Sequence, residues 1–365
     1  MQIIELFKYM VSQKSETPDD GGLLNFIEEY LPDFTAIRID REDVKNLFIY
    51  KKFGEGDHLC FAGHVDVVPA GEGWSTPPYE ATEKDGYIYG RGTQDMKSGV
   101  AAFVQALKEA KAFNGTLSLL LTSDEEGDAY YGTVKVLEYL KENAMLPDAV
   151  VVAEPTCEEV FGDAIKVGRR GSINGYITLK GKQGHAAYPE KAINPIHQIA
   201  TVLHKIAGVN LDDGDEFFSP SKFVITDIRS GMQVTNVTPN ELKMMFNVRN
   251  TTLTTQKEVE AFVEKNLKDF EYELKLTQGS YPFCTNTDTK VVKNIDKAIE
   301  NTTGIKPKHS TAGGTSDARF VAQYGIDVIE FGVKNDTIHS VNERTTPEEV
   351  DGLYRVFKKL IETWK

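Results

Sequence analysis

The sequence contains little cysteine and no long apolar run. Its three cysteines, Cys60, Cys157 and Cys284, are too few and too scattered among 365 residues for a disulfide framework. No stretch approaches the ~18–20 apolar residues that a membrane-spanning helix needs. Residues 1–11 also lack the basic-then-apolar order of a secretory signal. We therefore expect a soluble protein of a reducing, cytoplasmic compartment.

Positive charge is also in short supply. Lysine and arginine number 41 against 55 aspartates and glutamates, which gives a formal net charge of −14. Nucleic acids and anionic membranes are bound through basic patches, so neither is expected as a partner. A hydrophobic content of 40% and a charged content of 26% argue against wholesale disorder. At roughly 100–200 residues per domain, the length allows two or three domains.

Strand-like and helical segments alternate along the first 171 residues. Three short apolar runs have the composition of buried strands, at 59–62, 117–122 and 149–153. Helical periodicity occurs between or beside them, at 2–13, 98–112 and 132–141. The alternation returns near the C-terminus, at 291–301, 328–331 and 347–364. This order predicts an α/β fold with a largely parallel or mixed sheet.

A different pattern occupies the middle of the chain. Strand-like alternation is expected at 172–180, 221–229, 241–250 and 271–277, and helices are expected at 194–206 and 256–268. Two helices with four strands over ~110 residues suit an α+β sandwich of the ferredoxin-like type. We therefore expect a catalytic domain formed by 1–171 and 284–365, interrupted by an inserted domain at 172–283.

Polar residues follow the first buried strand in a His-x-Asp spacing. His64 and Asp66 come directly after the strand-like run 59–62. On extended backbone the two side chains lie on the same face, so the carboxylate can accept the free imidazole N–H and orient a metal-binding histidine. For this tripeptide alone, a surface histidine that lies near an aspartate by chance explains the spacing as well.

Further acidic residues follow the other expected strands. Asp95 lies in a glycine-containing loop before the helix at 98–112, and the glycine spacing there does not match a phosphate-binding loop. Glu125 and Glu126 end a run of three adjacent carboxylates after the strand 117–122, and Glu154 follows the strand 149–153. Adjacent carboxylates repel one another, so either they are solvated loop charges or a cation lies between them.

Together these positions favour a metal centre. Four expected strand ends or nearby loops contribute acidic or histidine side chains, and His339 adds a second imidazole from a late loop. Imidazoles and carboxylates without thiolates are the ligand set of a hydrolytic zinc, cobalt or manganese site. Two histidines and at least three carboxylates exceed what one tetrahedral ion needs. A two-metal centre with one bridging carboxylate is therefore predicted.

The order of these motifs resembles the co-catalytic zinc aminoacylase and carboxypeptidase family. The resemblance rests on five ordered motifs, His64-x-Asp66, Gly90-Arg91-Gly92-x-x-Asp95, Glu125-Glu126-Gly127, Glu154-Pro155 and Ile338-His339, and covers essentially the whole chain. It implies a zinc-exopeptidase-like catalytic domain with a mixed sheet and an inserted ferredoxin-like domain. In that family the inserted domain serves dimerisation and acts as a lid, so a homodimer is expected.

The resemblance also implies a role for each motif residue. His64 and Glu154 would hold one zinc, Glu126 and His339 the other, and Asp95 would bridge them, with cobalt as an alternative metal. Asp66 would orient His64, and Glu125 would be the general base. His185, supplied by the partner subunit, would stabilise the oxyanion; the alternative for His185 is a surface histidine at a strand end.

Within the family, Gly168-Arg169-Arg170-Gly171-Ser172 and Gly313-Gly314-Thr315-Ser316-Asp317 are similar to the branch that removes succinyl groups from diaminopimelate. The implied reaction cleaves N-succinyl-LL-2,6-diaminopimelate to succinate and LL-2,6-diaminopimelate in lysine and cell-wall precursor biosynthesis. The implied substrate-binding residues are Arg169, Arg249, Asn236, Thr315, Asn335 and Tyr188. For Arg249 a solvated strand-end arginine is the alternative. Acetylornithine deacetylase, aminoacylase or dipeptidase activity is the alternative function, followed by a non-catalytic metal-binding relative.

Overall fold

The chain forms two compact units. The structure, a computed structural model, describes Met1–Trp364. Unit 1 combines Met1–Gly168 with Thr285–Ser310 and the chain from Ser316 onward, and unit 2 combines Arg169–Cys284 with Thr311–Thr315. The short segment Thr311–Thr315 lies outside the range expected for the inserted domain. The boundaries at 171/172 and 283/284 stay a prediction for the folding domains.

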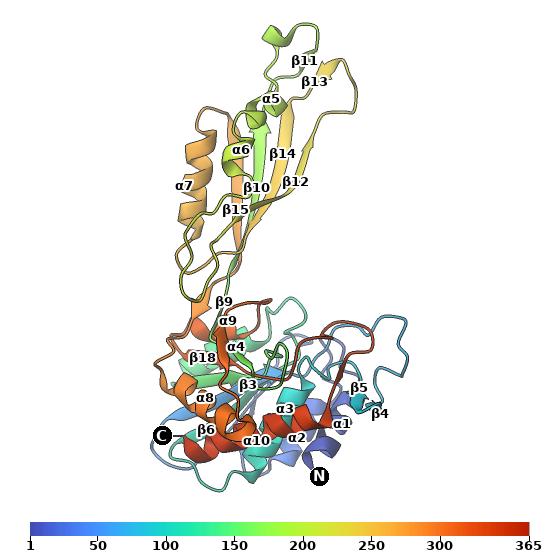
Figure 1. The fold of residues 1–365 in the computed structure, drawn as a ribbon, viewed down its shortest axis with the longest axis vertical. Coiled ribbons are helices and arrows are strands. Elements are labelled where there is room, and N and C mark those ends of the chain that lie inside the picture. The colour runs from blue at the N-terminus through green and yellow to red at the C-terminus, as the bar shows by residue number, and fades with distance from the viewer. Residues whose placement is uncertain (365) are drawn as a thin grey trace. The chain divides into compact units, whose positions relative to one another are not determined.

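Unit 1 is built on an eight-stranded sheet (Figure 1). Its strand order is β1 (Thr35–Arg38), β2 (Asn46–Lys52), β6 (Thr116–Thr122), β3 (His58–His64), β7 (Ala149–Val152), β18 (Asp327–Glu330), β8 (Ala164–Lys166) and β17 (Lys308–Ser310). β3 pairs in parallel with β6 and β7, whereas β1, β2 and β6 pair antiparallel. The sheet is therefore mixed, and the predicted α/β class is confirmed.

Helices cover this sheet and connect its parallel strands. They are α1 (Ile3–Ser12), α2 (Leu23–Tyr30), α3 (Lys97–Glu109), α4 (Thr133–Glu142), α8 (Lys290–Thr303), α9 (Ala318–Ala322) and α10 (Pro347–Thr363). A small sheet of β4 (Thr82–Lys84), β5 (Tyr87–Tyr89) and β19 (Arg344–Thr345) completes the unit. β9 (Gly168–Arg169) pairs with β16 (Phe283–Cys284). Among the described residues, no helix combines the length and the apolar character needed to cross a membrane.

Helix α3 is a deeply buried helix of unit 1. Its residues from Lys97 to Leu107 are all buried, because the helix packs between α1, α10 and strand β3. The rings of Phe61, Phe103 and Phe357 meet at this junction, with centroids 4.4–5.6 Å apart. Aromatic packing of this kind contributes strongly to a core. The loop that contains Asp95 leads directly into the N-terminal end of this buried helix.

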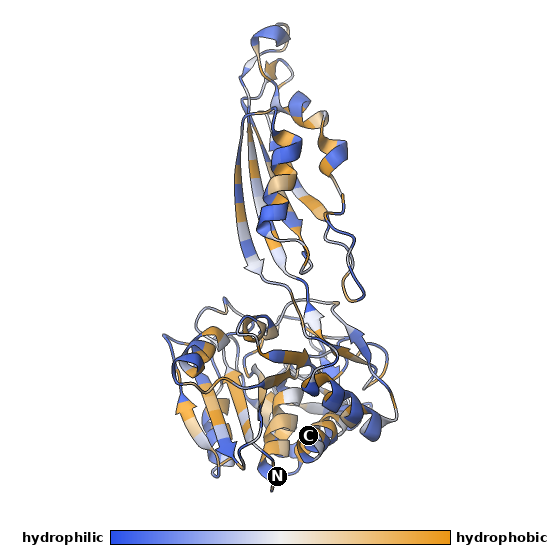
Figure 2. Cartoon of the chain, turned by 90° about the vertical axis from the view of Figure 1, so that its left-hand side faces the viewer, coloured by the Kyte–Doolittle hydropathy of each residue, from blue (hydrophilic) through white to orange (hydrophobic). Residues whose placement is uncertain are grey.

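Unit 2 has the ferredoxin-like arrangement that was predicted. Its four-stranded antiparallel sheet has the order β12 (Phe223–Ser230), β14 (Glu241–Val248), β10 (Ser172–Lys180) and β15 (Tyr272–Ser280). The sheet alternates buried and exposed residues, and Figure 2 shows the matching alternation of apolar and polar residues along its strands. The helices are α5 (Pro195–Ala200), α6 (Leu203–Ile206) and α7 (Gln256–Leu267), with a 3-10 turn at Pro189–Lys191. A short antiparallel pair, β11 (Gly184–His185) and β13 (Val237–Thr238), forms a separate two-stranded sheet.

One expected helix of unit 2 is divided in the structure. The single helix predicted at 194–206 is instead the pair α5 and α6, interrupted at Thr201 and Val202. Both interrupting residues are β-branched and therefore favour helical backbone only weakly. Ile199, Val202 and Ile206 still face the core of unit 2, so the apolar periodicity identified the buried face but not the break.

Candidate metal centre

Three parallel strands end at one edge of the unit 1 sheet. His64 is the last residue of β3 and is paired with Thr122, the last residue of β6. Glu125 and Glu126 come three and four residues after the end of β6, and Glu154 comes two residues after the end of β7. Because parallel strands place their carboxyl ends at the same edge, these side chains converge.

His64 lies at the centre of this convergence. Its Nε2 atom is 3.1 Å from Oδ1 of Asp95 and 3.7 Å from Oε1 of Glu154. Its other ring nitrogen, Nδ1, is 2.8 Å from the backbone carbonyl oxygen of Asp66. A carbonyl can only accept a hydrogen bond, so Nδ1 carries a proton; when Nε2 is deprotonated, its lone pair is the one available to a metal.

The position of Asp66 corrects the expected contact within the His-x-Asp motif. Its carboxylate is 3.6 Å from His64 Nδ1, too far for a hydrogen bond, and the backbone carbonyl orients the ring instead. The carboxylate accepts from Thr17 Oγ1 at 2.6 Å and from the backbone N–H groups of Glu125 and Glu126 at 3.4 and 3.2 Å. Asp66 therefore positions the Glu125–Glu126 turn as well as the histidine.

Asp95 lies between the two histidines. Its Oδ1 faces His64, and its Oδ2 is 3.4 Å from Nε2 of His339. The same His339 nitrogen is 2.9 Å from Oε1 of Glu126. The structure therefore brings all five predicted metal ligands and Glu125 into one group, here called the carboxylate–imidazole cluster: His64, Asp95, Glu125, Glu126, Glu154 and His339.

Two subsets of this cluster have the spacing of a metal site. Ligand atoms of His64, Asp95 and Glu126 lie within 4.8 Å of one another, and so do those of His64, Glu125 and Glu154. Both subsets share His64, and Glu125, which was expected to be an unligated base, is as close as the expected ligands. Oxygen and imidazole donors at this spacing are suited to divalent zinc, cobalt or manganese.

The electrostatics of the cluster also fit a cation. Burial and neighbouring carboxylates raise the pKa of Glu125 and of Glu154 well above the ordinary glutamate value. Burial opposes ionisation of Asp95, but hydrogen bonds from both imidazoles hold its pKa well below the usual range. Hydrogen bonds to Asp95 and Glu126 raise the pKa of His339 to about 10. Carboxylates outnumber imidazoles here, and divalent cations would neutralise the excess negative charge.

The strand ends and acidic runs of the sequence did not predict a further buried acid, Asp317. Burial raises the pKa of Asp317 to about 6, and its Oδ1 atom is buried without a hydrogen-bond partner. It interacts electrostatically with Glu125 and with His64. Asp317 lies in the motif Gly313-Gly314-Thr315-Ser316-Asp317, which was noted for its resemblance alone. Its position immediately before helix α9 is the sequence feature that could have identified it as a site residue.

Several predicted substrate-binding residues belong to unit 2. His185, Tyr188 and Asn236 lie together at the β11–β13 pair, where the His185 and Tyr188 rings are 5.9 Å apart and Asn236 O accepts from Ala186 N–H at 2.9 Å. The side chains of His185, Tyr188 and Asn236 are exposed. They form one polar and aromatic group within unit 2.

The remaining predicted substrate-binding residues lie in three other places. Arg169 is buried in unit 2, where its Nη1 donates to the carbonyl of Ala312 at 2.8 Å. Thr315 is exposed and lies, like Ala312, in the short segment Thr311–Thr315. Arg249 is exposed at the end of β14. Asn335 belongs to unit 1, where its N–H donates to the Cys157 carbonyl at 3.2 Å.

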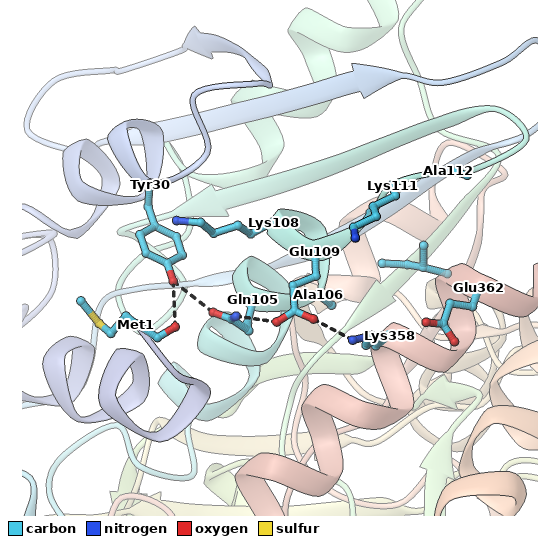
Figure 3. A pocket seen from close by; sticks show the side chains of 12 residues that line it. Met1, Tyr30, Gln105, Ala106, Lys108, Glu109, Lys111, Ala112, Lys358 and Glu362 are labelled. Atoms are coloured by element: carbon cyan, nitrogen blue, oxygen red, sulfur yellow. Dashed lines mark hydrogen bonds and ion pairs between the residues drawn. The ribbon is translucent and has the colours of Figure 1, made fainter.

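A separate cavity of about 810 Å³ lies at the opposite end of helix α3 (Figure 3). Gln105 connects Tyr30 to Glu109 through hydrogen bonds of 3.1 and 2.8 Å, and Lys358 of α10 pairs with Glu109 at 2.7 Å. Lys108 lies over the Tyr30 ring, 3.3 Å from its centroid. These contacts join α3 to α10 and to Tyr30 of α2.

Comparison with known proteins places the chain among metallohydrolases. The sequence profile described as peptidase family M20/M25/M40 matches residues 60–363. A protein of Sulfurimonas denitrificans named succinyl-diaminopimelate desuccinylase is 77% identical over 365 residues, with 100% of each chain covered. A protein of the same name from Nautilia profundicola is 66% identical over 364 residues, again with 100% of each chain covered.

Solved structures of the same fold agree with this relationship. Aminopeptidase PepT from Bacillus cereus has a TM-score of 0.81 at 20% identity, covering 99% of this chain and 97% of its own. A dinuclear metal binding peptidase of the M20 family from Bacillus subtilis has a TM-score of 0.72 at 16% identity, covering 99% and 98%. At these identities the likeness concerns the fold. On the profile match and the full-length relatives, the chain belongs to peptidase family M20/M25/M40.

Proposed function

We propose that the protein is a metal-dependent amide hydrolase that cleaves N-succinyl-LL-2,6-diaminopimelate to succinate and LL-2,6-diaminopimelate. The observation that carries the proposal is the carboxylate–imidazole cluster, in a chain whose full-length relatives at 66–77% identity are named succinyl-diaminopimelate desuccinylase. The product would serve lysine and cell-wall precursor biosynthesis. The chain has only three scattered cysteines, too few for a disulfide framework, which supports a reducing, cytoplasmic location.

The proposed centre holds two divalent ions, zinc or alternatively cobalt. His64 and Glu154 are the proposed ligands of one ion, and Glu126 and His339 of the other, with Asp95 shared between them. The contacts of Asp95 with both imidazoles, at 3.1 and 3.4 Å, support this division. When bound, the ions polarise the amide carbonyl and lower the pKa of the attacking water.

Glu125 is the proposed general base. It takes a proton from the attacking water and returns it to the nitrogen of the leaving amine. Its half-buried carboxyl beside the proposed ligands supports this role, and burial raises its pKa above the ordinary glutamate value. The backbone N–H of Glu125, held by the Asp66 carboxylate, keeps the base beside the cluster.

His185 of the partner subunit is the proposed donor to the tetrahedral oxyanion, which requires a homodimer formed through the inserted domain. Unit 2 exposes large apolar side chains that would otherwise face water: Val224, Ile228, Met232, Val234 and Met245. Grouped exposed apolar residues are typical of an interaction surface. The exposure of His185 supports a role outside its own core.

Local positive charge in unit 2 suits the anionic substrate. Arg170, Lys222 and Arg249 line one cavity of about 370 Å³, and no carboxylate is among its described lining residues. Arginine and lysine without acidic partners attract a carboxylate, and arginine can bind it with two hydrogen bonds. The residues proposed to bind the substrate are Arg249, Asn236, Tyr188, Arg169, Thr315 and Asn335.

A substrate panel with metal analysis tests the proposal. Succinyl-diaminopimelate, acetylornithine and simple dipeptides are offered to the purified protein before chelation, after exhaustive chelation, and after addition of zinc or cobalt. We expect hydrolysis of the succinylated substrate above all, loss of activity on chelation and recovery with metal. Preference for acetylornithine or a dipeptide would reassign the substrate. Full activity after metal removal would contradict the metal-dependent mechanism.

A further inference from the structure

Glu343 is a buried acid outside the proposed reaction, and it binds the loop that contains Asp95. Its side chain is 1% exposed. Its Oε1 accepts from the backbone N–H groups of Gln94 and Asp95, at 2.7 and 3.2 Å. Its Oε2 accepts from the N–H of Gly92 at 3.0 Å and from Arg91 Nη1 at 2.8 Å. One carboxylate thus fixes the backbone of segment 90–95, here called the glycine loop.

The same loop is fastened to the segment that contains His339. Gln94 donates from Nε2 to Asp336 Oδ1 at 2.6 Å and accepts at Oε1 from the N–H of Thr337 at 2.9 Å. Arg91 donates from Nη1 to the carbonyl of Ser340 at 3.2 Å. These contacts join the glycine loop to segment 335–343, here called the His339 loop, on both sides of His339.

The His339 loop needs such fastening because its backbone is locally unfavourable. His339 and Asn342 have φ angles of 56° and 61°, in the left-handed region that non-glycine residues adopt only under constraint. Asn342 Oδ1 accepts from the N–H and the Oγ of Ser75, both at 2.8 Å. Without strand or helix structure around His339, the position of its ring depends on these side-chain anchors.

We propose that Glu343 is a positioning residue. Through the hydrogen bonds that join the glycine loop to the His339 loop, here called the latch, it sets the spacing between Asp95 and His339. This spacing sets the affinity of the second metal ion, the one whose proposed ligands are Glu126 and His339. The inference rests on the proposed roles of Asp95 and His339 as ligands. Hydrogen bonds to an ionised, buried acceptor are strong and directional, so the latch holds both loops without contacting a metal itself. Partners of metal ligands act in this way, and their loss typically costs about 10–100-fold in metal affinity.

Glu343→Gln tests the latch with little change in side-chain volume. The amide nitrogen replaces one acceptor, so two of the four donors around residue 343 lose their partner. Metal content is measured after dialysis, and the two dissociation constants are measured by competition with a chromogenic chelator. We expect the first ion to stay bound and the second dissociation constant to rise by about 10–100-fold. The absorption spectrum of the cobalt-loaded variant should also change, because it reports coordination geometry.

Glu349→Gln is the matched control. Glu349 is also buried in unit 1 and accepts from Thr345 Oγ1 at 2.7 Å, but it does not bind the glycine loop. This variant should retain both metal affinities of the unmodified protein. Equal metal loss in both variants, or unchanged affinities in Glu343→Gln, would overturn the inference. An unmodified protein that binds no metal would instead contradict the proposed function.

Gln94→Met keeps the test decisive should Glu343→Gln fail to fold. Gln94 is buried, and methionine fills a similar volume without bonding Asp336 or Thr337. The second dissociation constant should rise by a smaller factor than in Glu343→Gln. Second-metal affinity equal to that of the unmodified protein would refute the latch.

Discussion

Asp66 shows how much a single side chain depends on residues distant in the sequence. The His-x-Asp spacing suggested a direct contact between the two side chains. In the structure, the backbone carbonyl of Asp66 accepts a hydrogen bond from the imidazole N–H, and its carboxylate turns toward Thr17 and the Glu125–Glu126 turn. These partners lie 49 to 60 residues away, so local spacing could not identify them.

The role of Glu125 can be tested by Glu125→Gln. The variant keeps the volume of the side chain but cannot accept a proton. Because general bases typically contribute 10²–10⁴-fold to rate, we expect kcat to fall by about this factor while metal content stays near that of the unmodified protein. Steady-state kinetics with metal analysis provides the measurement. Loss of one ion instead would mean that Glu125 is a ligand, as its place beside His64 and Glu154 allows.

Removal of metal should make stability depend on pH in a defined direction. In the metal-free protein, burial raises the folded-state pKa of Glu125 and Glu154, so the folded state binds more protons than the unfolded state above about pH 4.5. His339, whose pKa is raised to about 10 by hydrogen bonds to Asp95 and Glu126, contributes stability that is lost above about pH 6.5. The pH dependence of stability has the same sign for all three groups, so the stability of the metal-free protein should fall as pH rises.

Thermal unfolding of the chelated protein between pH 6 and 9 measures this effect. The unfolding temperature should decrease with pH, and added zinc should raise it more at pH 9 than at pH 6, since deprotonated ligands bind metal better. An unfolding temperature of the chelated protein that rises over this range would contradict the charge distribution described for the cluster.

At the scale of elements, a loop of unit 2 depends on one carboxylate. Asp212 accepts from the N–H groups of Gly214 and Ser221, both at 2.9 Å, and from the hydroxyls of Thr251 and Thr254 at 2.8 and 2.6 Å. These bonds connect the segment before β12 to the segment between β14 and α7. They hold the pKa of Asp212 well below its usual range, although burial opposes this.

Asp212→Ala should therefore destabilise unit 2. The loss of a charged acceptor shared by four donors is expected to cost about 2–3 kcal/mol of unfolding free energy. Urea unfolding followed by circular dichroism measures it. Asp213→Ala, at the exposed neighbouring position, is the control and should leave the midpoint unchanged. Equal midpoints for the two variants would show that the hydrogen bonds of Asp212 make no net contribution to the stability of unit 2.

Most helices and the longer strands could be predicted from the sequence, because they follow local apolar periodicity. The expected helix at 2–13 corresponds to α1, that at 98–112 to α3 and that at 256–268 to α7, with ends shifted by a few residues. The helix at 194–206 was predicted as continuous, but Thr201 and Val202 interrupt it. The pattern of buried residues continues across this break, so periodicity could not reveal it.

At the scale of the whole molecule, the proposed site requires two chains. Mixing His185→Ala with Glu125→Gln under conditions that exchange subunits tests this directly. In a mixed dimer, one site would combine an intact Glu125 with an intact His185 of the partner. Random exchange should then restore about a quarter of the unmodified activity, because half of the dimers are mixed and each has one intact site.

Two further measurements complete this test. Each variant alone should stay nearly inactive under the same exchange conditions, and sedimentation should show a dimer for both. If the mixture stays inactive although subunit exchange is verified with labelled chains, His185 does not act across the dimer. Recovery in the mixture would support both the homodimer and the role of the inserted domain.

The sequence by itself determined the family, the order of the elements and the residues of the carboxylate–imidazole cluster. It could do so because strand ends, acidic runs and histidines are local features with strict spacing. Only the tertiary structure decided which groups face one another: the carbonyl of Asp66 and His64, the buried Asp317 and Glu125, and Glu343 and the glycine loop. Those contacts join segments up to about 250 residues apart, and their geometry depends on how the strands and loops pack.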